Sequence, residues 1–477
     1  MGSLPTQRRL RAESVCIIGA GPSGLAAAKY LLAEHAFSRI AVFEQRSHPG
    51  GLWNYSPRPA TTPLPVPQTD PHPTPAAFVS PVYDSLETNL PKDLMRFSDL
   101  DWPSHNQLFP KHSQVLEYLQ RYADDVHHLI SFNTQVLHVR QQQESGWLVE
   151  TQHVSPQGEL DTVRHVFDAV IVASGHYAVP YVPAVEGIEA WNRAYPGAIT
   201  HSTFYRNPES YAGKKVVVVG NSASGIDIGT QIAAVCRKPL LQSQKSESYL
   251  SRALAPGKSE RPEITEYIVS DRSVRFKDGT IEAEIDAVLY CTGYFFAYPF
   301  LQSLDPPLVT TGHRVEKTYQ HIFYQSNPTL AILGLTQKVI PFPVAEAQSA
   351  VVARVYAGRL SLPSEAEMLS WEREVVAEMG DGKGFHVLQF PKDAEYINLL
   401  HDWAGSADER VLQDGLEVGK TPPYWSEREH WMRERFAAIK KAFQEFGEER
   451  HHKRTLDDVG YSFDKWHAER AQEQSEL

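Results

Sequence analysis

Two glycine-rich turns, about two hundred residues apart, carry the residues whose types and spacing suit a binding chemistry. The first turn reads GAGPSG at residues 19–24, and Glu44 stands twenty residues after its last glycine. The second reads GNSASG at residues 220–225, and Lys245 stands twenty residues after its last glycine. In a dinucleotide-binding βαβ unit the glycines let backbone approach a pyrophosphate, and the residue at that distance meets the adenosine ribose. The two turns therefore predict two dinucleotide sites.

The two ribose-facing residues have opposite charges. A carboxylate such as Glu44 hydrogen-bonds a free ribose diol and repels a phosphate, whereas Lys245 would pair with a 2′-phosphate. The pair predicts one unphosphorylated dinucleotide and one NADPH, which is the layout of a flavoprotein reduced by NADPH. Two readings stay open: Lys245 could be a solvated surface lysine, and Ser222 replaces the middle glycine of the second turn.

The segments around each turn predict the strand, helix and strand that such a site needs. Apolar, β-branched residues lead into both turns, and runs rich in alanine, isoleucine or leucine follow them. The expected elements are a strand at 14–18, a helix at 25–32 and a strand at 40–44, then a strand at 215–219, a helix at 222–236 and a strand at 239–243. This order places each turn at the N-terminus of a helix, where a pyrophosphate is stabilised.

Two further apolar strands, each ending in a small hydroxyl residue and glycine, occur at 169–175 and 287–293. Such segments would carry the chain from one nucleotide domain to the other and back. The sequence thus predicts an α/β fold of two Rossmann-like domains, with the NADPH domain inserted into a discontinuous FAD domain and a helical C-terminal part. The expected boundaries are 1–179 and 296–477 for the FAD domain and 180–295 for the NADPH domain.

Two segments lie outside this plan. Residues 57–81 hold nine prolines and few apolar side chains, so they predict an extended surface insertion in the first domain, with a partner-binding polyproline segment as the alternative. Near the C-terminus, Met432, Phe436, Ile439, Phe443 and Phe446 form one apolar stripe at helical spacing. We expect that helix to dock onto the FAD domain; a homodimer contact and a membrane-surface helix are the alternatives.

The amino-acid composition limits the kinds of partner that this protein is expected to bind. The 477 residues carry a net charge of −12, which argues against nucleic acid and anionic membranes. No stretch approaches the ~18 apolar residues that span a bilayer, and a secretory signal is not evident. Cys16, Cys236 and Cys291 lie far apart and predict buried thiols rather than a disulfide, redox pair or metal site. We therefore expect a cytoplasmic protein that binds no metal and is not stably inserted in a membrane.

The segment from Tyr195 to Arg206 lies between the two glycine turns, just before the strand that leads into the second one. Its spacing fits F-x-G-x-x-x-H-x-x-x-(Y/F), with Tyr195 in place of phenylalanine, His201 at the histidine and Tyr205 at the last aromatic. Here the chain resembles the flavin-containing monooxygenases, whose other motifs follow in the same order over roughly residues 14–445. Those motifs are GGLW at 50–53, LETN at 86–89, CTGY at 291–294 and a late stretch at 341–364 similar to the soluble fungal branch.

The resemblance implies an activity. In this family NADPH reduces FAD, the reduced flavin takes up O2 as a C4a-hydroperoxide, and a soft sulfur or nitrogen nucleophile is oxygenated. The expected substrates are small thiols, sulfides or amines, and the protein's main contribution is to exclude water and stray protons. No other catalytic constellation stands out in the sequence, which agrees with chemistry carried by the cofactor.

The resemblance also assigns site residues. Asn89, His201 and Tyr205 are the expected catalytic group: Asn89 beside the flavin and nicotinamide, the other two with Arg206 at the hinge supporting NADP⁺. A turn asparagine and a satisfied core histidine are the alternatives for Asn89 and His201. Leu52 and Trp53 would pack near the flavin, Ser222, Ser224, Gly225 and Asp227 would line the NADPH pyrophosphate, and Ser243 with Lys245 would hold its 2′-phosphate. The full set of expected cofactor-binding residues is Gly19, Gly21, Pro22, Ser23, Gly24, Glu44, Gln45, Gly51, Leu52, Trp53, Thr88, Asn89, Val136, Ser174, Gly175, Arg206, Gly220, Ser222, Ser224, Gly225, Asp227, Ser243, Lys245 and Gln337.

Two other functions remain open, a Baeyer–Villiger monooxygenase and a flavin-binding interaction protein, and the cysteines argue against a third. A Baeyer–Villiger monooxygenase shares both turns and the histidine but usually carries Trp where this chain has Tyr205. A disulfide oxidoreductase needs a close cysteine pair, which this sequence does not have. A non-catalytic flavin-binding interaction protein would use the proline-rich segment or the C-terminal helix for its partners.

Overall fold

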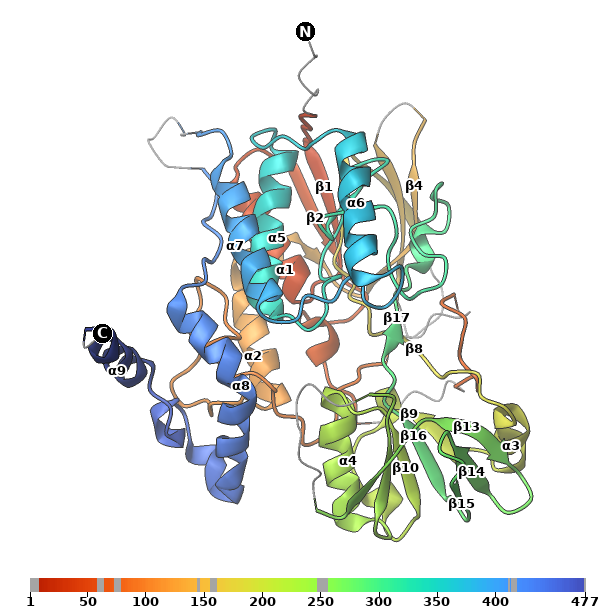
Figure 1. The fold of residues 1–477 in the computed structure, drawn as a ribbon. Coiled ribbons are helices and arrows are strands. Elements are labelled where there is room, and N and C mark those ends of the chain that lie inside the picture. Colours follow the sequence, from red (N-terminus) through yellow and green to blue (C-terminus); the bar gives the residue numbers. More distant parts are fainter. Residues whose placement is uncertain are drawn as a thin grey trace. The chain divides into compact units, whose positions relative to one another are not determined.

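The computed structural model describes residues 8–57, 64–72, 79–143, 146–154, 161–246, 256–410, 412 and 418–475 (Figure 1). The chain divides into two units, each built on a largely or wholly parallel sheet. Unit 1 comprises Met1–Asn54, Glu87–Gly175 and Tyr298–Leu477, and unit 2 comprises Tyr55–Leu86 and His176–Ala297. This is the expected α/β class, with one Rossmann-like unit inserted into the sequence of the other and helices at the C-terminal end.

Unit 1 contains a seven-stranded sheet in which β7 is the central strand and β1 lies next to it. β1 (Ser14–Ile18) pairs in parallel with β2 (Arg39–Phe43) on one side and with β7 (Ala169–Val172) on the other. The remaining strands extend the sheet outward: β3 (Ile130–Ser131) beyond β2, and β20 (Leu330–Ile332), β19 (Phe323–Tyr324) and β18 (Thr318–Tyr319) beyond β7. A separate antiparallel sheet holds β4 (Thr134–Gln141), β5 (Trp147–His153) and β6 (Thr162–Phe167).

Helices cover the large sheet of unit 1. Figure 1 shows α1, α5 and α7 side by side, and their apolar faces share one hydrophobic core with β1 and β7. The helices are α1 (Pro22–Ala33), α2 (His112–Tyr122), α5 (Pro341–Tyr356), α6 (Glu365–Met379), α7 (Lys392–Gly405), α8 (Glu427–Glu445) and α9 (Phe463–Ser475). Short 3₁₀ helices are η1 (Gly51–Trp53), η2 (Asp124–Leu129), η5 (Pro299–Leu301), η6 (Gly447–His452) and η7 (Asp457–Val459).

The expected C-terminal helix is α8, and it packs on unit 1 as predicted. Met432, Ile439 and Phe443 are buried in the core of that unit. Phe436 is half-buried, whereas Phe446, the C-cap residue after the helix ends at Glu445, is 40% exposed. The stripe is therefore one residue shorter than its spacing suggested.

Unit 2 contains a five-stranded, wholly parallel sheet with β10 (Val216–Val219) at its centre. Its order is β12 (Lys258–Arg261), β11 (Leu240–Ser243), β10, β16 (Ala287–Tyr290) and β9 (Ile199–His201). The valines of β10 are almost all buried, as suits a strand covered on both faces. The unit also holds β8 (Val179–Pro180), β13 (Ile264–Ile268), β14 (Ser273–Phe276), β15 (Ile281–Glu282), β17 (Tyr294–Phe295), α3 (Ile188–Ala194), α4 (Ala223–Val235), η3 (Ser202–Phe204) and η4 (Glu209–Tyr211).

The proline-rich segment, expected in the first domain, belongs to unit 2 where it is described. Gln68 and Val182 exchange two backbone hydrogen bonds, of 2.9 and 3.0 Å, and the Arg206 guanidinium reaches the carbonyl of Ser80. These contacts attach the segment to the inserted unit. Residues 58–63 and 73–78 of the expected insertion lie outside the described residues.

Candidate functional site

The first glycine turn is a place where backbone meets backbone. Gly19 has a φ of +103°, and a Cβ added there would stand 2.7 Å from the carbonyl oxygen of Ala173, at the end of β7. A Cβ at Gly24 would stand closer than 3.0 Å to the carbonyl oxygen of Gly19. Only glycine fits both positions, because no real Cβ approaches backbone that closely. The turn therefore brings β1, β7 and the start of α1 into direct contact.

The second turn has the same geometry. Gly220 has a φ of +109°, and its Cβ would stand 2.6 Å from the carbonyl oxygen of Cys291, at the end of β16. A Cβ at Gly225 would likewise stand closer than 3.0 Å to the carbonyl oxygen of Gly220. The two similar segments at 169–175 and 287–293 thus occupy equivalent places, since each ends against one glycine turn.

The helices that follow the two turns begin without a side-chain cap. Gly21, the N-cap residue of α1, has no side chain, and the side chain of Ser222, the N-cap residue of α4, accepts no capping hydrogen bond from its helix. By contrast, Ser364 and Ser426 cap α6 and α8 with complete capping boxes. Unpaired N–H groups at a helix N-terminus attract an anion, so α1 and α4 present the arrangement that binds a pyrophosphate.

Glu44 joins the end of β2 to the first turn. Its carboxylate is buried and accepts hydrogen bonds from the backbone N–H groups of Ala20 and Arg46, both at 2.8 Å. Burial raises the pKa of this carboxyl above its ordinary value, although the two hydrogen bonds oppose that change. Each oxygen keeps a second lone pair, so the carboxylate can also accept from a ribose diol. The neighbouring Gln45 is exposed and brings only its backbone to this edge.

The 3₁₀ helix η1 lies against the same turn. A Cβ at Gly51 would stand 3.0 Å from the Cα of Gly21, and Gly50 donates from its N–H to the carbonyl of Ala20 at 2.9 Å. Trp53 packs half-buried against the core of unit 1, and Leu52 is half-buried beside it. These contacts place residues 51–53 beside residues 19–24, as a single cofactor site would require.

Other expected cofactor residues lie at the ends of the neighbouring strands. Ser174 and Gly175 are exposed directly after β7, and Pro22 and Ser23 form the half-buried start of α1. Val136 is 8% exposed on β4. Gln337 follows β20, where its N–H donates to the carbonyl of His386 at 2.7 Å. Sequence reasoning missed its neighbour Thr336, whose hydroxyl is buried without a hydrogen-bond partner among the described residues.

At the second turn, the expected phosphate ligands differ in availability. Lys245 is 84% exposed, and its Nζ lies 3.8 Å from Glu263 Oε1, an acid that sequence reasoning missed. Ser243 is buried and donates its hydroxyl hydrogen to the carbonyl of Pro262 at 2.9 Å. The hydroxyl donor that the sequence assigned to a 2′-phosphate is therefore already used, because β11 ends directly beside that carbonyl. Ser224 is exposed in the first turn of α4.

Asp227, expected at the pyrophosphate, belongs to an internal network of unit 2. Its carboxylate accepts from the hydroxyl of Tyr83 and, at 3.2 Å, from Nε2 of Gln231. The hydroxyl of Tyr205 donates to Oε1 of Gln231 at 2.9 Å, and the rings of Tyr83 and Tyr205 meet edge to face at 5.4 Å. Asp227 thus ties α4 to the loop of Tyr83, and Gln231 ties it to the segment of Tyr205, which their sequence positions could not reveal.

His201 is fully buried and both its ring nitrogens are hydrogen-bonded to backbone. Nε2 donates to the carbonyl of Gly293 at 3.1 Å, and Nδ1 accepts from the N–H of Thr203 at 3.2 Å. Burial lowers the pKa of His201 to about 3, so the ring is neutral. The geometry is that of the satisfied core histidine, the alternative left open by the sequence, and it connects the ends of β9 and β16.

Arg206 is also occupied by backbone. Its guanidinium is buried and donates to four carbonyl oxygens at 2.7–3.1 Å, namely those of Ser56, Ser80, Thr203 and Tyr205. Burial lowers the pKa of Arg206 below its ordinary value. A side chain that holds four carbonyls positions two segments, and this contact fits a structural role better than direct contact with a nucleotide.

Asn89 lies in unit 1 on a short turn. Its side chain is exposed, whereas Thr88 before it is buried and donates its hydroxyl to the carbonyl of Leu90 at 2.8 Å. The N–H of Thr88 donates to the carbonyl of Pro110 at 2.9 Å. The amide of Asn89 is therefore presented outward from a backbone that is fixed on both sides.

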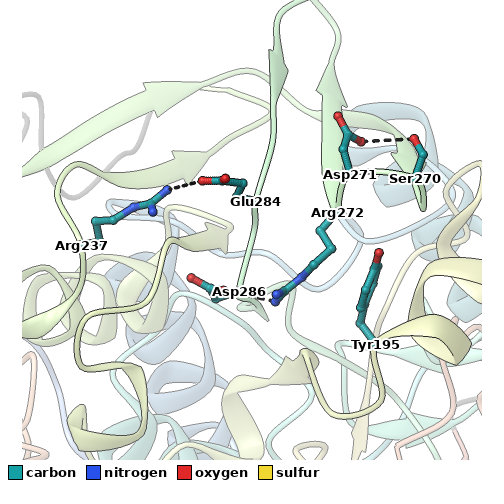
Figure 2. A pocket seen from close by; sticks show the side chains of 7 residues that line it. All are labelled: Tyr195, Arg237, Ser270, Asp271, Arg272, Glu284 and Asp286. Atoms are coloured by element: carbon teal, nitrogen blue, oxygen red, sulfur yellow. Dashed lines mark hydrogen bonds and ion pairs between the residues drawn. The ribbon is translucent and has the colours of Figure 1, made fainter.

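Figure 2 shows a surface cavity of about 380 Å³ in unit 2, and no residue of the second glycine turn lines it. Tyr195, Arg237 and Asp286 line it, and each precedes a strand of the parallel sheet, whereas Gly220 follows one. The cavity is thus at the amino edge, opposite to the edge where dinucleotides bind. Tyr195, which replaces the family phenylalanine, packs here under Arg272 and donates to the carbonyl of Val269 at 2.6 Å.

Among the described residues, no group of three or more His, Cys, Asp or Glu side chains could hold a metal ion. The same part of the chain has no helix long and apolar enough to cross a membrane. Cys16, Cys236 and Cys291 are all buried free thiols, as expected. Burial raises the pKa of Cys291 to about 12, which keeps that thiol protonated and unreactive.

A family model described as flavin-binding monooxygenase-like matches residues 12–260 and 258–407. The chain belongs to this family. Relatives in Arabidopsis thaliana include the flavin-containing monooxygenase FMO GS-OX-like 4, which is 34% identical over 385 residues, 76% of this chain and 80% of the relative. Another, FMO GS-OX4, is 32% identical over 90% of this chain and 93% of its own length. These are plant proteins, so the fungal branch named from the sequence stays a prediction.

Solved structures of flavin monooxygenases have the same fold. S-allyl-L-cysteine S-oxygenase from Allium sativum aligns with a TM-score of 0.76 at 28% identity, over 94% of this chain and 97% of that one. Cyclohexanone monooxygenase aligns with a TM-score of 0.55 at 14% identity, over 83% of this chain and 98% of that one. The second likeness is one of fold alone. As a flavin-containing monooxygenase, the protein is an enzyme of the oxidoreductase class.

Proposed function

We propose that this flavin-containing monooxygenase uses NADPH and O2 to oxygenate soft sulfur or nitrogen atoms of small thiols, sulfides or amines. The observation that carries the substrate class is the likeness, at 28% identity over 94% of this chain, to a protein named an S-allyl-L-cysteine S-oxygenase. The opposite charges of Glu44 and Lys245 support the choice of two different dinucleotides.

The residues around both turns fit FAD and NADPH. In unit 1, FAD would be held by the backbone N–H groups at the start of α1, by the backbone at Gly21, which has no side chain, and by the carboxylate of Glu44. Thr336 would add a hydroxyl that has no hydrogen-bond partner among the described residues. In unit 2 the uncapped start of α4 would hold the NADPH pyrophosphate, and Lys245 its 2′-phosphate. When bound, the flavin supplies the redox and oxygen chemistry.

The chain's own residues would bind and orient rather than transfer protons. His201 and Arg206 hold the segment after β9 through backbone contacts, and Tyr205 ties it to α4 through Gln231. We assign these three to positioning of the NADPH-binding unit, and Asn89 to direct contact with the cofactors. Three unpaired thiols suit a reducing compartment, so we place the enzyme in the cytoplasm.

Labelled oxygen tests the proposal. Purified FAD-loaded protein is given NADPH and ¹⁸O2 with S-allyl-L-cysteine, a tertiary amine or cyclohexanone, and the products are analysed by mass spectrometry. We expect one ¹⁸O atom in a sulfoxide or N-oxide. Label in a lactone from cyclohexanone instead would favour the Baeyer–Villiger alternative. Consumption of NADPH with unlabelled organic products from all three would contradict the proposed monooxygenation.

A further inference from the structure

The segment that carries Asn89 is held by a lysine from the distant C-terminal helix. Lys440 of α8 donates from Nζ to the carbonyl of Thr88 at 2.9 Å, and the same Nζ lies 3.4 Å from Glu87 Oε2. Only 14% of the Lys440 side chain and 11% of the Glu87 side chain are exposed. An ion pair this sheltered is screened less by water than a surface pair, so its geometry is well defined.

Glu87 is the centre of a small cluster of donors. Besides Lys440, Arg450 of η6 approaches Oε1 of Glu87 with its Nε at 3.3 Å, and Gln107 donates to the same oxygen at 3.2 Å. Glu87 also forms an antiparallel bridge with Lys111 just before α2. Side chains from α8 and η6 and a loop side chain therefore converge on the residue at which the chain re-enters unit 1.

The lysine itself is well anchored. Its Nζ lies 4.5 Å from the ring centre of Phe109 and 5.3 Å from that of Phe443, one turn further along α8. Aromatic faces attract a cation, and the apolar stem packs beside them. Lys440 therefore reaches Thr88 from a rigid helix rather than from a free surface.

These contacts fix the backbone on both sides of Asn89. The N–H of Thr88 is held by Pro110, its carbonyl by Lys440, and its hydroxyl closes the turn to Leu90. The exposed amide of Asn89 is then free to move only through its own side-chain torsions. Since an error of 1 Å in placing a reacting group costs as much as about 100-fold in rate, such fixing matters for chemistry.

We propose that Lys440, held by Glu87, is a positioning residue that sets the orientation of Asn89 toward the cofactors. The inference rests on the proposed function, because Asn89 matters only if that amide meets the flavin and nicotinamide. The contact joins residues about 350 positions apart in sequence, and both partners lie within unit 1.

Two variants on α8 make a matched pair. Lys440→Met keeps the length of the stem but removes the charge and the donor. Lys441→Met makes the same change at the next residue, which is 78% exposed and pairs loosely with Glu445 at 3.9 Å. Lys440→Arg restores a cation and donors, and Glu87→Gln tests the same contact from the other side if Lys440→Met fails to fold.

The rate of hydrogen exchange of the Thr88 amide measures how firmly Lys440 and Glu87 hold this turn, and the measurement does not depend on activity. The Thr88 N–H keeps its acceptor at Pro110 in Lys440→Met, but loss of the charge-assisted hydrogen bond to the Thr88 carbonyl loosens the same turn, so we expect exchange about tenfold faster, with Lys441→Met unchanged. In the FAD-loaded enzymes, we expect Lys440→Met to divert NADPH oxidation from oxygenated product to hydrogen peroxide by about tenfold, at unchanged FAD content. Lys440→Arg should recover most of both effects.

Two outcomes would overturn the positioning role. One is unchanged exchange in Lys440→Met and Glu87→Gln. The other is faster exchange with the same share of NADPH going into product as in the wild type. Failure of the proposed function shows differently, since the wild-type enzyme itself would then form no oxygenated product.

Discussion

Glu44 accepts a hydrogen bond from the backbone N–H of Ala20 at 2.8 Å, and this contact closes the first glycine turn against the end of β2. The acid that the sequence assigns to a ribose thus also shapes the turn that would receive the pyrophosphate. One side chain serves both parts of the nucleotide, so its removal has two measurable consequences.

Glu44→Ala should lower both FAD content and stability. The substitution removes a ribose acceptor and takes the carboxylate acceptor away from two backbone donors, the buried N–H of Ala20 and the partly buried N–H of Arg46. Each such donor costs about 1–3 kcal/mol. FAD content by absorbance and thermal unfolding of the flavin-free protein measure the two effects. Glu13→Ala, an exposed acid beside β1, is the control and should change neither.

Gly225→Ala should damage the second turn and spare the first. The added methyl group would overlap the carbonyl oxygen of Gly220, which forces the turn open at a cost of about 1–3 kcal/mol. We expect a higher KM for NADPH at normal FAD content. Gly405→Ala in α7, where no atom lies within 4 Å of the new Cβ, is the control and should be neutral or slightly stabilising. A normal KM in Gly225→Ala would argue against this turn as the NADPH site.

Substitutions of Lys245 and of Glu263 should change the KM for NADPH in opposite directions, with little change in the KM for NADH. Lys245→Ala removes the cation expected at the 2′-phosphate and should raise the KM for NADPH about tenfold, with little change for NADH. Glu263→Gln removes an acid 3.8 Å from Lys245 and should lower the KM for NADPH, by no more than about fivefold because the pair is exposed. Equal changes for both nucleotides in either variant would count against phosphate recognition here.

Stability should fall as the medium becomes acidic, in part through two buried histidines. Burial lowers the pKa of His201 and of His321 to about 3. Because the unfolded chain titrates near pH 6.5, their contribution is complete above that pH and is lost as the pH falls toward 3. His321 also lies with Nδ1 3.0 Å from Nδ1 of His386, a hydrogen bond that a second proton would break.

His321→Asn isolates one of these two contributions. Asparagine tolerates the left-handed backbone at this position, where φ is +54°. Urea unfolding at several pH values between 7.5 and 4.5 should show a slope of stability against pH that is smaller by up to one proton in the variant, whatever its absolute stability. An identical slope would mean that His321 does not titrate on unfolding.

Local features of the sequence predicted the fold and the two turns well. The glycines at 19, 24, 220 and 225 are required where backbone touches backbone, and the strands before them show their burial in unbroken apolar runs. One error lies at an element end, where Phe446 follows the last residue of α8 and is exposed, and another concerns the proline-rich segment, which belongs to unit 2 where it is described rather than to the first domain. The turns and strands that were predicted correctly depend on neighbours in sequence.

Roles set by distant residues could not be predicted in the same way. The donor of Ser243 is taken by Pro262, and the carboxylate of Asp227 by Tyr83, which lies 144 residues away in sequence. The partly buried pair of Glu87 and Lys440 joins positions 353 residues apart. Residue type and spacing indicate which residues could bind a cofactor. Only the fold shows whether their hydrogen-bonding groups already have partners within the protein.

The central claim is that a base beside the second turn selects NADPH to reduce a flavin held at the first. Anaerobic mixing of the FAD-loaded protein with NADPH or NADH, followed by loss of flavin absorbance in a stopped-flow instrument, tests it most directly. At equal, subsaturating concentrations we predict bleaching on the order of tenfold or more faster with NADPH. Equal rates with the two nucleotides, or a flavin that neither reduces, would contradict the account.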